Sequence, residues 1–238
     1  MGIDWRKAWV ERKYKHPVPG NAQSWDNRAK DFSESAGTSS YVDSFISYLA
    51  PEKGMSILDM GCGAGTLALP FARMGLEVIA ADLSPGMLEV MQEAVQTEGL
   101  AGIRSVELDF NAPWEVWEAA GITEDCVDLA IASRSTAVDD LWAAFEKLER
   151  AARERVIVTM ATEYSPRHAM RMGTVVEGGI PYIPSYIYAT NILMQMGRYP
   201  TIRYIDSDKI EESGAFTPIR WAFISWDVRP KAWVEKNI

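Results

Sequence analysis

The stretch SILDMGCGAGTLALPFARMGLEVIAADLSPGML, residues 56–88, decides the fold of this chain. An apolar run at 56–61 ends in glycines and leads into an amphipathic window at 66–75 that a glycine closes. A second apolar run at 77–82 precedes a longer window, 84–99, which has serine at the N-cap and proline in its first turn. Buried strands that alternate with helices of this length predict βαβ units and a parallel sheet.

The same alternation continues along the chain. The expected strands are 56–61, 77–82, 103–109, 127–133, 155–161, 201–206 and 219–228. The expected helices are 22–34, 38–50, 66–75, 84–99, 114–119 and 139–152. Because βαβ crossovers are right-handed, we predict a doubly wound α/β fold with a mostly parallel, seven-stranded sheet and an antiparallel pair at its edge.

We expect one domain at 51–238, preceded by a helical extension at 1–50. A segment at about 162–199 interrupts the βα rhythm, and we interpret it as an insertion that forms a substrate lid. Five of the nine tyrosines and five of the eleven methionines fall in 160–199, which suits an apolar, aromatic or cationic small molecule. The alternative is that 185–197 is a helix that faces the core.

Composition excludes several classes of protein. Hydrophobic residues make up 47% of the chain and charged residues 24%, as in globular proteins. Two cysteines and two histidines are too few for a disulfide framework or a structural zinc site, and we expect no metal. The N-terminus lacks the apolar core of a secretory signal, so we expect a cytoplasmic protein. The uncharged stretch 178–197 is interrupted by prolines, so we expect no membrane span.

The net charge of −9 counts against nucleic acid as a partner, because affinity for nucleic acid needs clustered positive charge. The charge is uneven, since residues 1–30 carry seven Lys/Arg and three acids. We interpret this basic arm as a solvated helix face, with a docking arm for an anionic partner as the alternative.

Three glycines follow the first strand at alternate positions, 61, 63 and 65. Glycine lets the chain turn tightly and lets a ligand approach the backbone without meeting a side chain. In open α/β sheets, ligands bind at the carboxyl ends of the strands, where the strand order reverses. The glycines therefore predict a ligand site at this end of the sheet.

Acidic residues end the next two strands. Asp82 is placed to accept hydrogen bonds from the two hydroxyls of a ribose, although an acid here also suits the start of the following helix. Asp109 ends the third strand and precedes Phe110, so a carboxylate and an apolar ring are available for adenine. Together with the glycines, these acids predict an adenosine-shaped crevice.

The glycine spacing is G-x-G-x-G, which is neither the dinucleotide fingerprint nor a P-loop. Here the chain resembles the class I S-adenosylmethionine-dependent methyltransferases. LDMGCGAGTLALPFA is similar to their first motif, VIAADLSPGML to their second and ELDF to their third. The likeness covers about 21–228, and SWDNRAKDF at 24–32 resembles the family's N-terminal helix. The resemblance implies a Rossmann-like methyltransferase fold with S-adenosylmethionine as cofactor.

The resemblance also implies residue roles. Asp59 is expected to hold the glycine loop or the methionine amino group, and Trp25 and Arg28 to close the entrance. Ser133 and Arg134 are expected near the sulfonium and the acceptor. The full cofactor set is expected to be Asp59, Gly61, Cys62, Gly63, Gly65, Thr66, Asp82, Leu83, Ser84, Met87, Asp109, Phe110, Ser133 and Trp25.

The methyl acceptor is expected to be a small molecule. The run ASRST at 132–136 lacks the Asn/Asp-Pro-Pro-aromatic pattern of amino-methylating family members, and neither cysteine follows a proline as in cytosine-C5 members. His168 is a hypothetical general base, Arg134 a hypothetical carboxylate ligand, and Tyr182 is expected to line the pocket. The alternatives are an RNA or protein methyltransferase, and a non-catalytic protein that binds S-adenosylmethionine.

Overall fold

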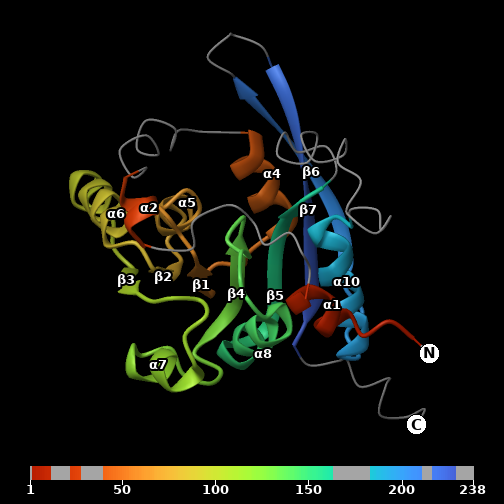
Figure 1. Cartoon of the computed structure of the whole chain (residues 1–238). Helices are drawn as coiled ribbons and strands as arrows, with labels where there is room; N and C mark the ends of the chain where they lie inside the picture. Colours follow the sequence, from red (N-terminus) through yellow and green to blue (C-terminus); the bar gives the residue numbers. More distant parts are fainter. Residues whose placement is uncertain (1, 12–21, 28–39, 163–182, 211–215, 229–238) are drawn as a thin grey trace.

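The computed structural model describes residues 2–11, 22–27, 40–162, 183–210 and 216–228. One sheet runs through the molecule in the order β3-β2-β1-β4-β5-β7-β6 (Figure 1). Its strands are β1 (Ser56–Met60), β2 (Glu77–Asp82), β3 (Ile103–Glu107), β4 (Val127–Ser133), β5 (Ala152–Ala161), β6 (Thr201–Ile210) and β7 (Phe216–Asp227). The first five strands pair in parallel, and β7 pairs antiparallel with both β5 and β6.

This topology confirms the predicted doubly wound, seven-stranded α/β fold. The strand order reverses between β1 and β4, the two neighbours at the centre of the sheet. The antiparallel pair β7–β6 lies at the edge of the sheet, as expected, with β6 as the outermost strand. β6 is longer than expected, since its pairing with β7 continues to the last described pair, Ile210 and Phe216.

Helices cover both faces of the sheet (Figure 1). They are α1 (Trp5–Glu11), α2 (Ala22–Asp26), α4 (Ser40–Leu49), α5 (Ala68–Arg73), α6 (Pro85–Glu98), α7 (Trp114–Ala119), α8 (Leu141–Ala151) and α10 (Ser185–Gln195). The helix expected at 66–75 is reduced to α5 because the turns of the glycine loop continue to Leu67. α6 begins as expected, since the Ser84 side chain accepts a hydrogen bond from the Met87 N–H.

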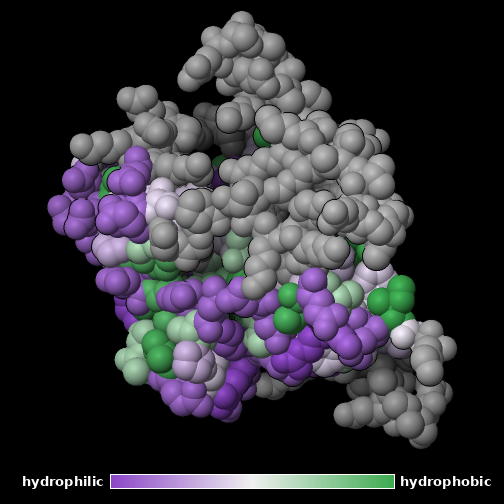
Figure 2. All heavy atoms as spheres, viewed as in Figure 1, coloured by the Kyte–Doolittle hydropathy of each residue, from purple (hydrophilic) through white to green (hydrophobic). Residues whose placement is uncertain are grey.

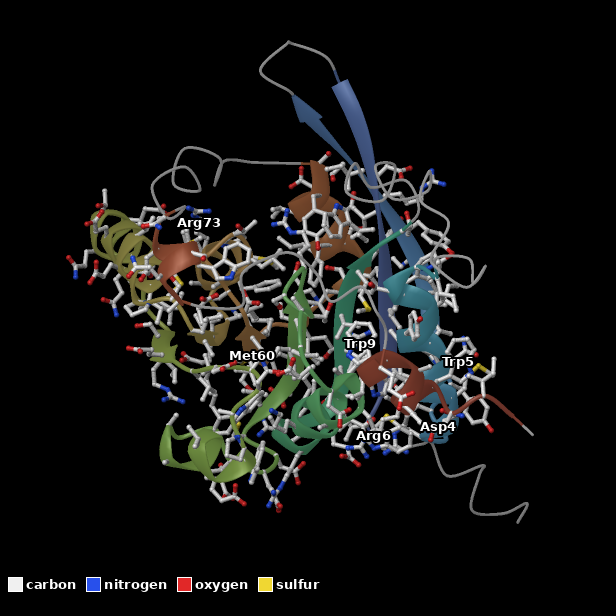
Figure 3. All side chains as sticks on the ribbon, viewed as in Figure 1. Asp4, Trp5, Arg6, Trp9, Met60 and Arg73 are labelled. Atoms are coloured by element: carbon white, nitrogen blue, oxygen red, sulfur yellow. The ribbon has the colours of Figure 1, made fainter. Side chains whose placement is uncertain are left out.

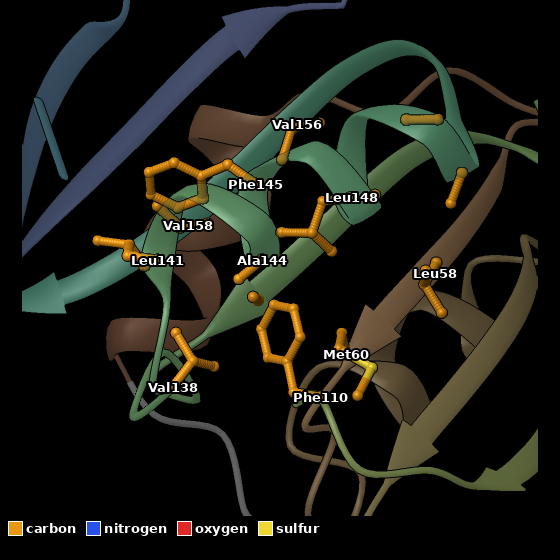
Figure 4. Packing of buried hydrophobic residues seen from close by; sticks show 14 of the residues in the cluster. Leu58, Met60, Phe110, Val138, Leu141, Ala144, Phe145, Leu148, Val156 and Val158 are labelled. Carbon is orange, nitrogen blue, oxygen red and sulfur yellow. The ribbon is translucent and has the colours of Figure 1, made fainter. Parts of the chain in front are cut away.

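Two large hydrophobic clusters, one on each face of the sheet, form the core of the described residues. Alternate residues of β4 belong to different clusters: Ala130 and Ala132 face the cluster of α7, α8 and α10, and Leu129 and Ile131 face that of α4 and α5. Figure 4 shows the first cluster. A strand that is buried on both faces has a continuous apolar sequence, which is why the apolar runs predicted the positions of these strands.

The helices described within the first fifty residues contribute to this same core. Trp9 of α1 is 1% exposed and donates its indole N–H to the Val138 carbonyl at 3.2 Å. Trp5 and Trp9 of α1 contact Tyr188 of α10, and Arg6 pairs with Asp140 at the start of α8 (Figure 3). Tyr41 and Phe45 of α4 are buried in the other cluster.

Hydrophilic side chains gather over α6 on the face that Figure 2 shows. None of the helices that the structure describes is long and apolar enough to cross a membrane.

Candidate active site

The glycine loop that follows β1 is tied to β2. The N–H groups of Gly61 and Cys62 donate to the Ala81 carbonyl at 2.7 and 3.0 Å. Gly61 and Gly63 have φ angles of 77° and 55°, in the left-handed region that favours glycine. A Cβ on Gly61 would lie 2.2 Å from the Cβ of Ser135, whereas a Cβ on Gly63 would meet nothing within 4 Å. The loop is therefore closely packed at 61 and open at 63.

Asp82 joins this loop to α6. Its carboxylate accepts the Gly63 N–H at 2.8 Å and the Ser84 N–H at 2.9 Å. The side chain is buried, and burial raises the pKa of Asp82, although the hydrogen bonds from Ser84, Gly63 and Leu83 act against the rise. A carboxylate has about four acceptor positions, so these contacts leave capacity for a hydroxyl ligand.

Asp59 lies on the central strand β1, beside Asp82 of the neighbouring strand β2. It is 2% exposed, and burial together with the charge of Asp82 raises the pKa of Asp59 to about 7. The Arg134 charge and the Ala68 N–H favour the ionised form but do not cancel the desolvation. Two neighbouring buried carboxylates make this end of the sheet suitable for a cationic ligand.

The N-terminal helix α2 is fixed over the glycine loop. Asp26 accepts the Ser84 hydroxyl at 2.5 Å and the Gly86 N–H at 3.0 Å, so it binds the start of α6. The neighbouring Trp25 packs against Ala64 and Met87. A residue expected to close the entrance is thus held against the loop by an acid that the sequence reasoning had not singled out.

A second group of side chains lies at the ends of β4 and β5. The Tyr41 hydroxyl forms hydrogen bonds with Ser133 Oγ at 2.7 Å and Thr159 Oγ1 at 2.8 Å. The Arg134 guanidinium carbon lies 4.4 Å from the centre of the Tyr41 ring and 5.8 Å from that of Trp221. We call Tyr41, Ser133, Arg134, Thr159 and Trp221 the β4–β5 cluster.

Comparison with known proteins gives a consistent result. A family model for a methyltransferase domain matches residues 57–155. An uncharacterized protein of Haemophilus influenzae is 33% identical over 196 residues, covering 81% of this chain and 68% of that protein. The chain belongs to the class I S-adenosylmethionine-dependent methyltransferases. It is an enzyme of that class, and its cofactor is S-adenosylmethionine.

Other matches to this methyltransferase are shorter or more distant. A ubiquinone biosynthesis O-methyltransferase of Cereibacter sphaeroides is 38% identical over 86 residues, covering 36% of this chain and 32% of that enzyme. A 23S rRNA uracil-C5-methyltransferase of Alkalilimnicola ehrlichii is 28% identical over 123 residues, covering 50% of this chain and 28% of that enzyme. Each match spans less than a third of the named enzyme.

A solved structure shares the fold of the methyltransferase. The crystal structure of a SAM-dependent methyltransferase from Aquifex aeolicus has a TM-score of 0.62 and 15% sequence identity. The match covers 86% of this chain and 98% of that one.

Two expected cofactor residues, Asp109 and Phe110, have other partners in the structure of the methyltransferase. Asp109 is exposed and accepts the Asn111 N–H at 2.8 Å. The Phe110 ring packs 5.8 Å from Trp117 in the core and lies near Met60 in Figure 4. Cys62 of the glycine loop is buried in the α4–α5 cluster, and burial together with the nearby charges of Asp59 and Asp82 raises its pKa well above the usual value. The raised pKa disfavours the thiolate, as the packing interpretation of Cys62 expects.

The remaining expectations divide into two groups. Thr66, Leu83 and Ser84 lie on or beside the glycine loop and the start of α6, the first two half-buried. His168, Tyr182 and Arg28 lie outside the described residues, as does most of the expected lid, of which α10 is described and packs its Ala189 into the core. Within the described residues, no group of three His, Cys, Asp or Glu could hold a metal ion.

Sequence reasoning missed Tyr41, Thr159 and Asp26. A polar residue inside the apolar run VIVTMA was a signal for Thr159, which is fully buried. Tyr41 sits in an ordinary amphipathic helix and carried no signal. Its role depends on contacts with residues 92 and 118 positions away.

Proposed function

We propose that this methyltransferase acts on a small molecule, which it binds beyond the carboxyl ends of β4 and β5. The β4–β5 cluster carries the proposal, because it offers aromatic rings, hydroxyls and one guanidinium beside Asp59. Such a mixture suits a small, partly apolar ligand that a few polar groups orient. The net charge of −9 and the match to a ubiquinone biosynthesis O-methyltransferase support the same substrate class.

In this proposal the cofactor occupies the β1–β2 half of the site. Asp59 accepts the methionine ammonium group, which relieves the cost of burying that carboxylate. Asp82 accepts the ribose hydroxyls, and the open space at Gly63 leaves room for the cofactor beside the loop. Leu83 and Met87 pack on the adenine, and the exposed Asp109, which follows β3, accepts a hydrogen bond from the adenine amino group.

The bound cofactor supplies an activated methyl group on a sulfonium. The chain has to align the acceptor with that group and to exclude water, and alignment of this kind contributes about 7–11 kcal/mol. α2 and Trp25 cover the cofactor half, and the β4–β5 cluster orients the acceptor. For a protonated acceptor, the proposed general base is His168, with Tyr182 at the pocket wall.

Calorimetry with S-adenosylmethionine, S-adenosylhomocysteine and NAD tests the cofactor site. We expect the first two to bind and NAD not to bind. Assays of methyl transfer from labelled cofactor then compare a library of small molecules with total RNA and with protein extracts. Labelling of RNA or protein alone would overturn the small-molecule proposal, and cofactor binding without transfer to any class would favour the non-catalytic alternative.

The RNA alternative has one supporting observation, the partial match to an rRNA methyltransferase. It would use the basic residues of the N-terminal arm. Two of these, Arg6 and Lys7, form ion pairs with Asp140 and Glu11 in the structure. RNA retention that falls with salt and disappears on deletion of residues 1–20 would revive this alternative.

A further inference from the structure

The backbone of Arg134 is held in an unusual conformation. Its φ angle is 60°, in the left-handed region that residues with a Cβ rarely adopt. The Arg134 N–H points to Thr159, 3.0 Å from Oγ1 and 3.3 Å from the carbonyl oxygen, and these contacts fix the turn at the end of β4. Conformations of this kind persist where the surrounding structure enforces them, often at ligand sites.

The Arg134 side chain rests on a rigid aromatic support. Tyr41, whose ring lies 4.4 Å from the guanidinium carbon, is 1% exposed, and two hydrogen bonds fix its hydroxyl. Trp221 contacts the Tyr41 ring edge-on, with 6.1 Å between ring centres. The guanidinium is thus positioned by stacking on these rings, and its N–H groups remain available.

Arg134 differs in this respect from most arginines in the described part of the chain. Those that form an ion pair with a carboxylate there are Arg6, Arg73, Arg150, Arg153, Arg198 and Arg220. The Arg134 guanidinium has no such partner and no hydrogen-bond acceptor among the described residues. The titratable groups that face it are Asp59, where the Arg134 charge acts against the rise in pKa, and the neutral Tyr41 hydroxyl.

Tyr41 and Trp221 place the guanidinium on one side of the point between β1 and β4 where the strand order reverses. The Tyr41 hydroxyl bonds to residues of β4 and β5, and Trp221 belongs to β7. The glycine loop and Asp82 lie at the other side, on β1 and β2. Arg134 therefore lies on the β4–β5 side of the site, with Asp59 of β1 at the border between the two halves.

We propose that Arg134 binds a carboxylate of the methyl acceptor, so that the substrates of this enzyme are small carboxylic acids. This inference rests on the proposed function. A guanidinium presents a planar fork of N–H donors that matches a carboxylate in two parallel hydrogen bonds. The stacked side chain loses little freedom on binding, because Tyr41 and Trp221 already hold it in place.

The test uses the full chain and measures S-adenosylhomocysteine production with hydroxybenzoic and aminobenzoic acids, each beside its carboxamide. We expect at least one acid to be methylated, with kcat/KM about 10- to 100-fold above that of its amide. Arg134→Gln should remove this preference through a higher KM, and Arg134→Lys should restore part of it. The matched control is Arg203→Gln, which removes an exposed arginine stacked on Tyr48 at 3.8 Å and should leave the preference unchanged.

Calorimetry with S-adenosylhomocysteine separates the acceptor carboxylate from that of the cofactor. We expect Arg134→Gln to change this affinity by less than about twofold. A loss of tenfold or more would assign Arg134 to the cofactor carboxylate and overturn the proposal. Equal turnover of acids and amides, or no turnover of either, would also overturn the proposal. The proposed function itself would fail only if no small molecule of any charge is methylated.

Discussion

At the scale of the residue, the most informative group is the Asp59 carboxyl. Its raised pKa, about 7, means that the folded protein without ligand binds this proton more tightly than the unfolded chain, whose aspartates titrate near 4. The free energy of unfolding is therefore lowered progressively as the pH rises from about 4 to about 7. A cation placed beside Asp59 would reverse this cost.

We predict that cofactor binding releases a proton. Near pH 6 Asp59 is mostly protonated, and the methionine ammonium group should ionise it, so up to one proton should leave. At pH 8 the release should approach zero, and affinity should rise between these pH values. Calorimetry in buffers of different ionisation enthalpy measures the proton count. Asp59→Asn is the control and should show neither effect; an unchanged proton count in this variant would rule Asp59 out.

A second prediction concerns Asp82. Asp82→Ala should weaken S-adenosylhomocysteine binding by about 1.5–3 kcal/mol or more, the value of a hydrogen bond to a charged group. The variant also frees the Gly63 and Ser84 N–H groups, so Asp82→Asn, which keeps an acceptor oxygen, should lose less. Titration calorimetry compares the three proteins, and equal affinities would remove Asp82 from the cofactor site.

At the scale of the element, the glycine loop contains two positions with different requirements. Gly61 packs against Ser135, whose hydroxyl donates to the Met60 carbonyl at 2.6 Å, so the loop after β4 is attached to the end of β1. Gly63 faces open space in a similar backbone conformation. Substitution of Gly61 should therefore affect the stability of the fold, whereas substitution of Gly63 should affect ligand binding.

We predict that Gly61→Ala mainly destabilises the fold, because its Cβ would overlap the Ser135 Cβ. Gly63→Ala should cost only the left-handed backbone strain, about 1–2 kcal/mol, but should lower cofactor affinity at least about tenfold, since the new methyl group enters the proposed cofactor space. Thermal unfolding and calorimetry measure the two effects. Full affinity in Gly63→Ala would show that the cofactor lies elsewhere.

At the scale of the whole molecule, the N-terminal region belongs to the core. The Trp9 indole N–H bonds to Val138, which lies between the Arg134 turn and α8. α1 also contacts α10 through the rings of Trp5 and Tyr188, 5.7 Å apart. The region that the sequence marks as an extension therefore supports the loop that carries the proposed acceptor site.

We predict that Trp9→Ala lowers the free energy of unfolding by about 3–5 kcal/mol, as for other buried tryptophans. The loss should affect one cooperative transition, because Trp9 is part of the main cluster. Denaturant unfolding monitored by fluorescence and circular dichroism tests this, with Trp9→Phe as a milder control that keeps the ring. Unchanged stability would mean that α1 is only a surface attachment.

The sequence by itself determined the doubly wound α/β fold, the glycine loop after β1, and the positions of Asp59 and Asp82 at the ends of their strands. Parallel strands that are buried on both faces appear as apolar runs, and a loop that needs left-handed backbone appears as spaced glycines. These signals are local in the chain, so they could be interpreted without coordinates.

The tertiary structure alone decided the acceptor half of the site. Tyr41 contacts Ser133 and Thr159, which lie 92 and 118 positions further along the chain. No local sequence pattern indicates such a contact. The same holds for Asp26, which reaches α6 from a separate helix. The Arg134 guanidinium suits a ligand only because folding places an aromatic ring under it, while no carboxylate of the described residues forms an ion pair with it.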